Sequence, residues 1–162
     1  MANLIYQLPQ TAKVWKSSGG DAVWTPTSLG SGAGRQGAHL DFGSTARSRL
    51  YAWICSIVPG ATRVVGQIGL RIYWKAGDGT YYENDDGTGD AAVSSINKLR
   101  NLRVLGAITI DEDAAVPMTA SGLIELPHRY GAPVGWNGSS NALSSTATDF
   151  FFALYPVPDE IQ

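Results

Sequence analysis

The sequence predicts an all-β protein: a β-sandwich, of the jelly-roll type or a related Greek key, with one short helix and extended terminal arms. Short runs of β-branched and aromatic residues alternate with turns, because 19 glycines and 8 prolines interrupt the 162 residues at close intervals. The hydrophobic fraction of 44% is enough for a buried core without disulfides. An immunoglobulin-type sandwich is the alternative, although a single cysteine cannot supply its Cys…Trp…Cys pattern.

The length suits one domain flanked by two extensions. We predict an N-terminal arm at 1–10, a single sandwich domain at 11–155 and an extended C-terminal tail at 156–162. Residues 17–37, rich in glycine, serine and threonine, are also predicted to extend from the core rather than belong to it. Apolar residues in such segments have little to bury against within their own domain. We therefore expect the arms to pack on a neighbouring subunit.

In chain order, the first strands are predicted at 12–16, 38–42, 48–57 and 69–76. The segment 48–57 is apolar on both faces, which predicts a central strand covered on both sides. In 69–76, apolar residues alternate with Arg71, Tyr73 and Lys75, as in a strand with one polar face.

The one helix is predicted at 91–102, where apolar residues recur every third position from Val93 to Leu102. Asp90 is expected to be its N-cap, and the cations near its end suit the helix dipole. Four further strands are predicted at 103–110, 118–126, 130–136 and 149–155.

The charge balance excludes some partners. A formal net charge of −2 argues against nucleic-acid binding, which needs a large basic excess. No apolar run reaches the length of a membrane span, and no signal peptide is recognisable, so we expect synthesis in a cytoplasm and no membrane partner. Only 16% of the residues are charged, and eight of the twelve basic residues are arginine, which interfaces favour over lysine. This composition indicates a surface partly covered by a partner.

No pattern in the chain predicts catalysis, a metal site or a cofactor. Cys55 lies in an apolar run and is expected to be a buried structural thiol. His39 and His128 are the only histidines, and no nucleophile motif accompanies them. The loop 84–90 carries oxygen ligands of the kind calcium takes, but it lacks the order of an EF-hand, and a solvated turn is the simpler interpretation. The glycine motif at 32–37 lacks the strand and helix of a dinucleotide site.

Two of the five tryptophans, Trp24 and Trp136, lie near predicted turns. Three interpretations stay open for them: partial burial at the sandwich edge, anchoring at a protein interface, or stacking on a sugar ring. If they bind a sugar, they are its platforms.

Three segments resemble small β-rich virion proteins of tailed bacteriophages: 91–102, 129–137 and 155–162. The resemblance extends to head decoration (cement) proteins and to tail- or fibre-associated modules. It implies a virion location, a homo-oligomer, often a trimer, and binding to a capsid or tail scaffold. It carries no catalytic residues.

Together these features predict a phage capsid decoration protein on the virion surface, assembled in the host cytoplasm and binding the major capsid protein. The residues expected to contact the capsid or a neighbouring subunit are Leu4, Ile5, Tyr6, Arg47 and Arg49. The alternative is a tail-associated carbohydrate- or receptor-binding sandwich that uses Trp24 and Trp136.

Overall fold

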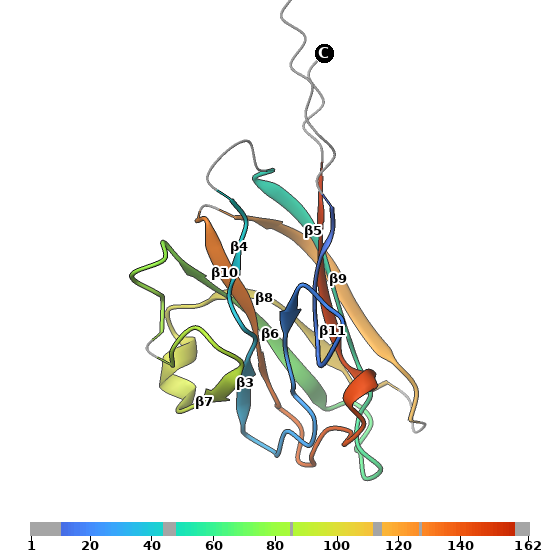
Figure 1. The fold of residues 1–162 in the computed structure, drawn as a ribbon. Helices are drawn as coiled ribbons and strands as arrows, with labels where there is room; N and C mark the ends of the chain where they lie inside the picture. The colour runs from blue at the N-terminus through green and yellow to red at the C-terminus, as the bar shows by residue number, and fades with distance from the viewer. Residues whose placement is uncertain (1–10, 44–47, 85, 112–114, 127, 158–162) are drawn as a thin grey trace, which may run out of the picture.

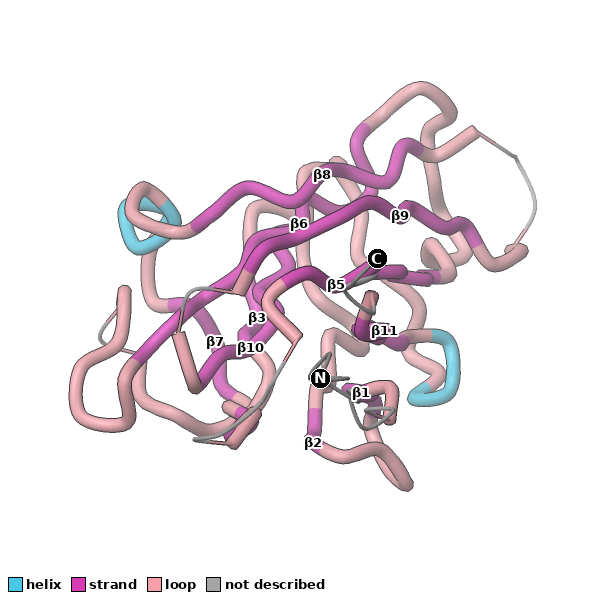
Figure 2. The backbone as a smooth tube through the Cα atoms, turned by 90° about the horizontal axis from the view of Figure 1, so that it is seen from above, coloured by secondary structure: helices cyan, strands magenta, loops and turns pink. Residues whose placement is uncertain are grey.

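The chain forms two β-sheets packed face to face, and the predicted β-sandwich is confirmed (Figures 1 and 2). The computed structural model describes residues 11–43, 48–84, 86–111, 115–126 and 128–157. The five-stranded sheet contains, in spatial order, β2 (Ala22–Val23), β1 (Lys13–Lys16), β11 (Phe151–Pro156), β5 (Leu50–Ile57) and β9 (Met118–Glu125). The six-stranded sheet contains β7 (Ala91–Val93), β3 (Gly34–Gln36), β10 (Tyr130–Trp136), β6 (Ile68–Gly77) and β8 (Arg103–Thr109), and β4 (Leu40–Asp41) also pairs with β10.

The core lies between the sheets and is rich in aromatic rings. Alternation along β5 sends Tyr51, Trp53, Cys55 and Ile57 inward, and all four are buried. Trp15 of β1 is completely buried and meets Trp74 and Phe152 edge to face, with ring centroids 5.7 and 5.8 Å apart. Such pairs each contribute about 0.5–1.5 kcal/mol beyond their buried area. Burial raises the pKa of the Cys55 thiol, as expected for an inert structural cysteine.

One side of the sandwich is closed by Trp15 of β1 and by Trp24, which belongs to the segment 17–37. The indole N–H of Trp15 donates to the carbonyl of Ala38 at 2.7 Å, and that of Trp24 donates to the carbonyl of Arg35 at 3.2 Å. Trp24 is completely buried. The expectation that 17–37 extends from the core is therefore wrong: this segment contributes β2, β3 and part of the core.

On the opposite side, β8 and β9 approach each other over Trp53. A Cβ atom at Gly122 of β9 would lie 2.9 Å from the indole nitrogen of Trp53, and one at Gly106 of β8 would lie 3.3 Å from its ring. Glycine at both positions lets the two edge strands close over the ring. Arg103 then links the edges by donating to the carbonyl of Glu125 at 2.8 Å.

The predicted helix at 91–102 is wrong in its first half. Residues 91–93 form β7, which pairs with β3, and only η1 (Ile96–Leu99) is helical, with 3-10 geometry. A repeat of three residues fits a 3-10 helix, whose side chains eclipse at i and i+3. The cap is Ser95, whose hydroxyl accepts from the backbone N–H of Asn97, and not the predicted Asp90. A second 3-10 turn, η2 (Ala147–Asp149), precedes β11.

The described chain begins and ends at the same end of the sandwich (Figure 1). β1 and β11 are antiparallel, with Lys13 opposite Leu154, so the start of one lies beside the end of the other. Beyond β11, the N–H of Val157 donates to the carbonyl of Leu50 at 3.0 Å. The predicted arm 1–10 and the last residues of the predicted tail lie outside the described residues.

Candidate interaction site

The outward side of the five-stranded sheet is predominantly apolar. Residues directly opposite each other on antiparallel strands share a face. The register therefore places Leu123, Ala52 and Tyr155 in one row across β9, β5 and β11. The next row brings Ile54 beside Ala153. We call this surface the apolar face; its apolar members are Val14, Leu50, Ala52, Ile54, Leu123, Phe151, Ala153 and Tyr155.

The apolar face is open to solvent where β11 ends. Leu123 is 64% exposed and Tyr155 is 49% exposed, whereas most other members are half-buried. Among the outward residues of β1, β11, β5 and β9, only Lys16 and Glu125 are charged, and the register places them at opposite corners. An apolar surface with charges at its margin is typical of a site that another molecule covers.

On the corresponding side of the six-stranded sheet, the chain itself covers β10 and part of β6, while Val104 of β8 is 68% exposed. Val93, Leu99 and Leu102 pack on Val134 of β10 and form a second buried cluster outside the sandwich core. Tyr73 and Trp136 pack against it. The connection between β6 and β8 thus supplies this sheet with a lid. The described residues form no such cluster over the apolar face.

A buried lysine holds the start of that connection. Lys75 is completely buried, and its ammonium group donates to Oε1 of Gln36 at 3.0 Å and to the carbonyl of Gly87 at 2.5 Å. The amide nitrogen of Gln36 faces three loop carbonyls at 2.9–3.1 Å: those of Asp86, Gly87 and Gly89. The loop 84–90, whose oxygen ligands suggested calcium, therefore turns its carbonyl oxygens towards the ammonium group of Lys75 and the amide of Gln36. Among the described residues, no three His, Cys, Asp or Glu side chains lie close enough to hold a metal ion.

An ion pair of Asp90 with Arg35 fixes the C-terminal end of the loop 84–90. Arg35 of β3 binds Asp90 through two hydrogen bonds, at 2.9 and 2.7 Å, and the hydroxyl of Thr25 donates to the same carboxylate. Burial alone would raise the pKa of Asp90, but the hydrogen bonds from Arg35 and Thr25 outweigh it and lower that pKa. Asp90 is thus a tether between β3 and β7.

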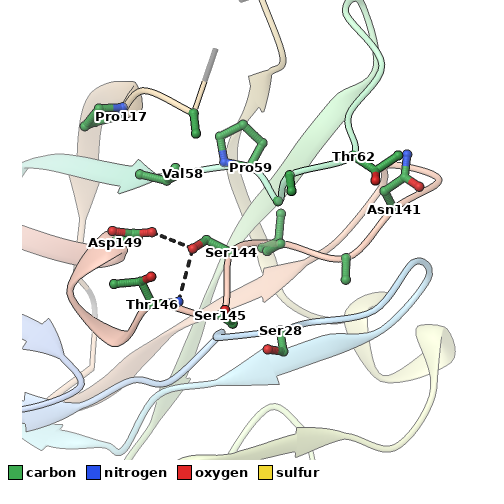
Figure 3. A pocket seen from close by; sticks show the side chains of 15 residues that line it. Ser28, Val58, Pro59, Thr62, Pro117, Asn141, Ser144, Ser145, Thr146 and Asp149 are labelled. Carbon is green, nitrogen blue, oxygen red and sulfur yellow. Dashed lines mark hydrogen bonds between the residues drawn. The ribbon is translucent and has the colours of Figure 1, made fainter. Parts of the chain in front are cut away.

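An open cleft of about 760 Å³ lies at the end of the sandwich opposite the described chain ends (Figure 3). Its lining is rich in small and hydroxyl side chains, and Ser144 donates to Asp149 while accepting from the N–H of Thr146. Neither histidine lines the cleft. Glu125 and Asp149 do not form a carboxylate pair, because the register places them at opposite ends of the sheet.

His39 lies outside this cleft, with its ring 4.2 Å from that of Tyr82. Both ring nitrogens are buried and have no hydrogen-bond partner among the described residues. Burial, and then the positive charge of Lys75, lower the pKa of His39 to about 4. The imidazole is therefore neutral near pH 7, and it packs as an apolar ring.

The structure describes only one of the five residues that the sequence suggested for contacts with a partner. Leu4, Ile5, Tyr6 and Arg47 lie outside the described residues. Arg49 is exposed just before β5, at the end where the described chain starts and stops.

The two suggested ligand platforms do not form one surface. Trp24 is completely buried in the core and touches the inward side of Gly135, so it cannot present a face to a sugar. Trp136 is half-buried against the cluster on the outer side of the six-stranded sheet. The interpretation of Trp24 as a platform is wrong because the segment around it folds into the core.

Sequence reasoning missed Leu123 and Tyr155, the two exposed members of the apolar face. A signal was present. Leu123 is followed by Ile124, which is buried in the core, so β9 is apolar on both faces at this point. The apolar outward residues of β5 carried the same signal, which predicted a strand covered on both sides.

No family model, curated protein or solved structure matches this chain. In the part of the chain that the structure describes, no helix is long and apolar enough to cross a membrane. Its function is therefore inferred from the surfaces and contacts above.

Proposed function

We propose that the sandwich is a jelly roll and that the chain is a structural subunit of a bacteriophage virion. The observation that carries the proposal is the nested pairing of strands. The first long strand pairs with the last (β1 with β11), the next inward pair is β3 with β10, then β5 with β9, and the innermost is β6 with β8. Successive pairs alternate between the two sheets, as when one long hairpin is rolled up. Viral capsid domains use this architecture.

Within the virion, the proposed role is that of a capsid decoration protein that binds the major capsid protein lattice. Two features support it. The segments 91–102, 129–137 and 155–162 resemble those of small virion proteins, and the apolar face offers a surface with few charges. Binding to the assembled lattice stabilises that state by mass action, and many copies on a symmetric shell add avidity.

Jelly rolls also occur in lectins, which keeps sugar binding as the competing idea. The sugar-binding alternative needed Trp24 and Trp136 as stacking platforms. Trp24 is buried, and the two rings lie on opposite sides of the six-stranded sheet. No other observation favours it, so the structural role is the better supported one.

Quantitative mass spectrometry of purified particles tests the proposal, with the major capsid protein as the internal reference. A copy number comparable with that of the capsid protein is expected for a decoration protein. A handful of copies would contradict the decoration role and indicate a tail position. Absence from the particle would refute the virion proposal altogether.

A further inference from the structure

The two sheets of this sandwich differ in how their outer sides are covered. The six-stranded sheet has its lid in the β6–β8 connection, where Val93, Leu99 and Leu102 pack on Val134. The five-stranded sheet has the apolar face, with Leu123 64% and Tyr155 49% exposed. Four strands about 4.8 Å apart and about 20 Å long give this face an area of roughly 300–400 Å². Exposed apolar patches on a monomer are often functional.

The chain carries a segment that suits this face. Residues 1–10 contain Leu4, Ile5, Tyr6 and Leu8 and no Asp, Glu, Lys, Arg or His. In extended form ten residues span about 33 Å, which exceeds the length of the face. A segment without charged side chains matches a surface whose only charges, Lys16 and Glu125, lie at its corners.

The point where this segment joins the sandwich favours a neighbouring molecule over its own sheet. Lys13 is the first residue of β1 and lies opposite Leu154, two residues before β11 ends at Pro156, so Thr11, where the described chain starts, is level with the end of the sheet. Residues 1–10 would have to reverse direction to lie on the face of their own molecule. A second copy related by a symmetry axis receives them without that reversal. Closed symmetry makes the exchange reciprocal, so each copy covers another.

We propose that the apolar face is the binding site for residues 1–10 of a second copy of this chain. Leu123 and Tyr155 are the side chains that the incoming segment covers. The inference concerns contacts between copies and does not rest on the virion proposal, since an oligomer free in solution satisfies it.

Sedimentation equilibrium of the full-length chain over a range of concentrations gives the first test. Leu123→Asp places a charge at the most exposed side chain of the face, outside the core, so the sandwich should still fold. The matched control is Val104→Asp on β8, where the side chain is 68% exposed and lies on the other sheet. We expect self-association of the natural chain. Its dissociation constant should rise at least tenfold in Leu123→Asp and on deletion of residues 1–10, and should not change in Val104→Asp.

Cross-linking distinguishes a neighbour's segment from the molecule's own. Cys55 is completely buried, so introduced cysteines meet little competition. One chain carries Tyr6→Cys and a second carries Leu123→Cys, and they are mixed and oxidised. We expect a disulfide between the two different chains. A double variant that forms the disulfide only within one chain would overturn the inference, as would a natural chain that stays monomeric at every concentration. Self-association that both the deletion and Leu123→Asp leave unchanged would overturn it as well.

Discussion

Acidification should destabilise the protein through His39. Burial against Tyr82 and the charge of Lys75 lower its pKa from 6.5 to about 4. Between these two values the unfolded chain binds a proton that the folded chain does not, so stability rises with pH in this range. The contribution of neutral, buried His39 to the free energy of unfolding is complete above pH 6.5 and is lost as the pH falls towards 4. A gap of about 2.5 pH units corresponds to about 3.4 kcal/mol, and the partial exposure of the ring reduces this to about 1–2 kcal/mol.

Urea unfolding at several pH values between 7.5 and 4.5 measures this effect. Carboxylates also titrate in the range, so the informative quantity is the difference between the natural chain and His39→Gln. The natural chain should lose about 1–2 kcal/mol more than His39→Gln over the range. Parallel curves for the natural chain and His39→Gln would refute the reasoning.

Three further predictions concern the core and the loop. Gly131→Ala should destabilise the protein by about 2 kcal/mol or more, because its Cβ would lie 2.3 Å from Trp74. We expect a fall in Tm of about 4–8 °C, and an unchanged Tm would contradict the packing described. Trp15→Phe should lower the free energy of unfolding by about 2–3 kcal/mol, because it opens a void and leaves the carbonyl of Ala38 without its donor. Urea unfolding measures this loss, and a loss below about 0.5 kcal/mol would contradict the packing described. Calcium or a chelator should leave Tm unchanged, because the loop before β7 turns its carbonyls towards Lys75; a rise in Tm with calcium would indicate a site that this arrangement does not contain.

The long strands could be predicted because a period of two residues is visible in the sequence itself. The segment predicted at 48–57 is β5 (Leu50–Ile57), and that at 130–136 is β10 within the same bounds. The hydrophobic pattern and the bounding turns are local properties, so they need no knowledge of the partners. Strand order is not local, and the nested pairing was beyond the sequence.

The failures have a tertiary origin. In 91–102, a repeat of three favoured a helix, but pairing with β3 turned the first residues into a strand. In 17–37, small and polar residues hid a core segment, because Gly37 lets the Trp15 ring approach the backbone and Gln36 is buried through hydrogen bonds instead of apolar contacts. Partners far along the chain decide both cases, and local propensity is easily overruled by them.

The apolar face follows from a pattern that the sequence already contained. The outward residues of β5, Leu50, Ala52 and Ile54, predicted a central strand covered on both sides. The described chain covers only the inward side. The residue pattern along β5 therefore correctly indicated an apolar outward side, and an apolar side of a sheet favours a cover.

The sequence pattern does not specify the source of that cover. Each sheet of a sandwich buries one side against the other sheet, and its outer side is either polar or covered. This chain covers the outer side of the six-stranded sheet with the connection between β6 and β8, anchored by Lys75 and by the ion pair of Asp90 with Arg35. In the five-stranded sheet only β1 and β2 follow each other in the chain, the other strands connect to the six-stranded sheet, and the described residues supply no comparable lid. Residues 1–10 carry further apolar side chains, and they join the sandwich at the end where Tyr155 is exposed. The cover that we propose from a second copy buries Leu123 and Tyr155 of the five-stranded sheet, while the sandwich itself folds within one chain.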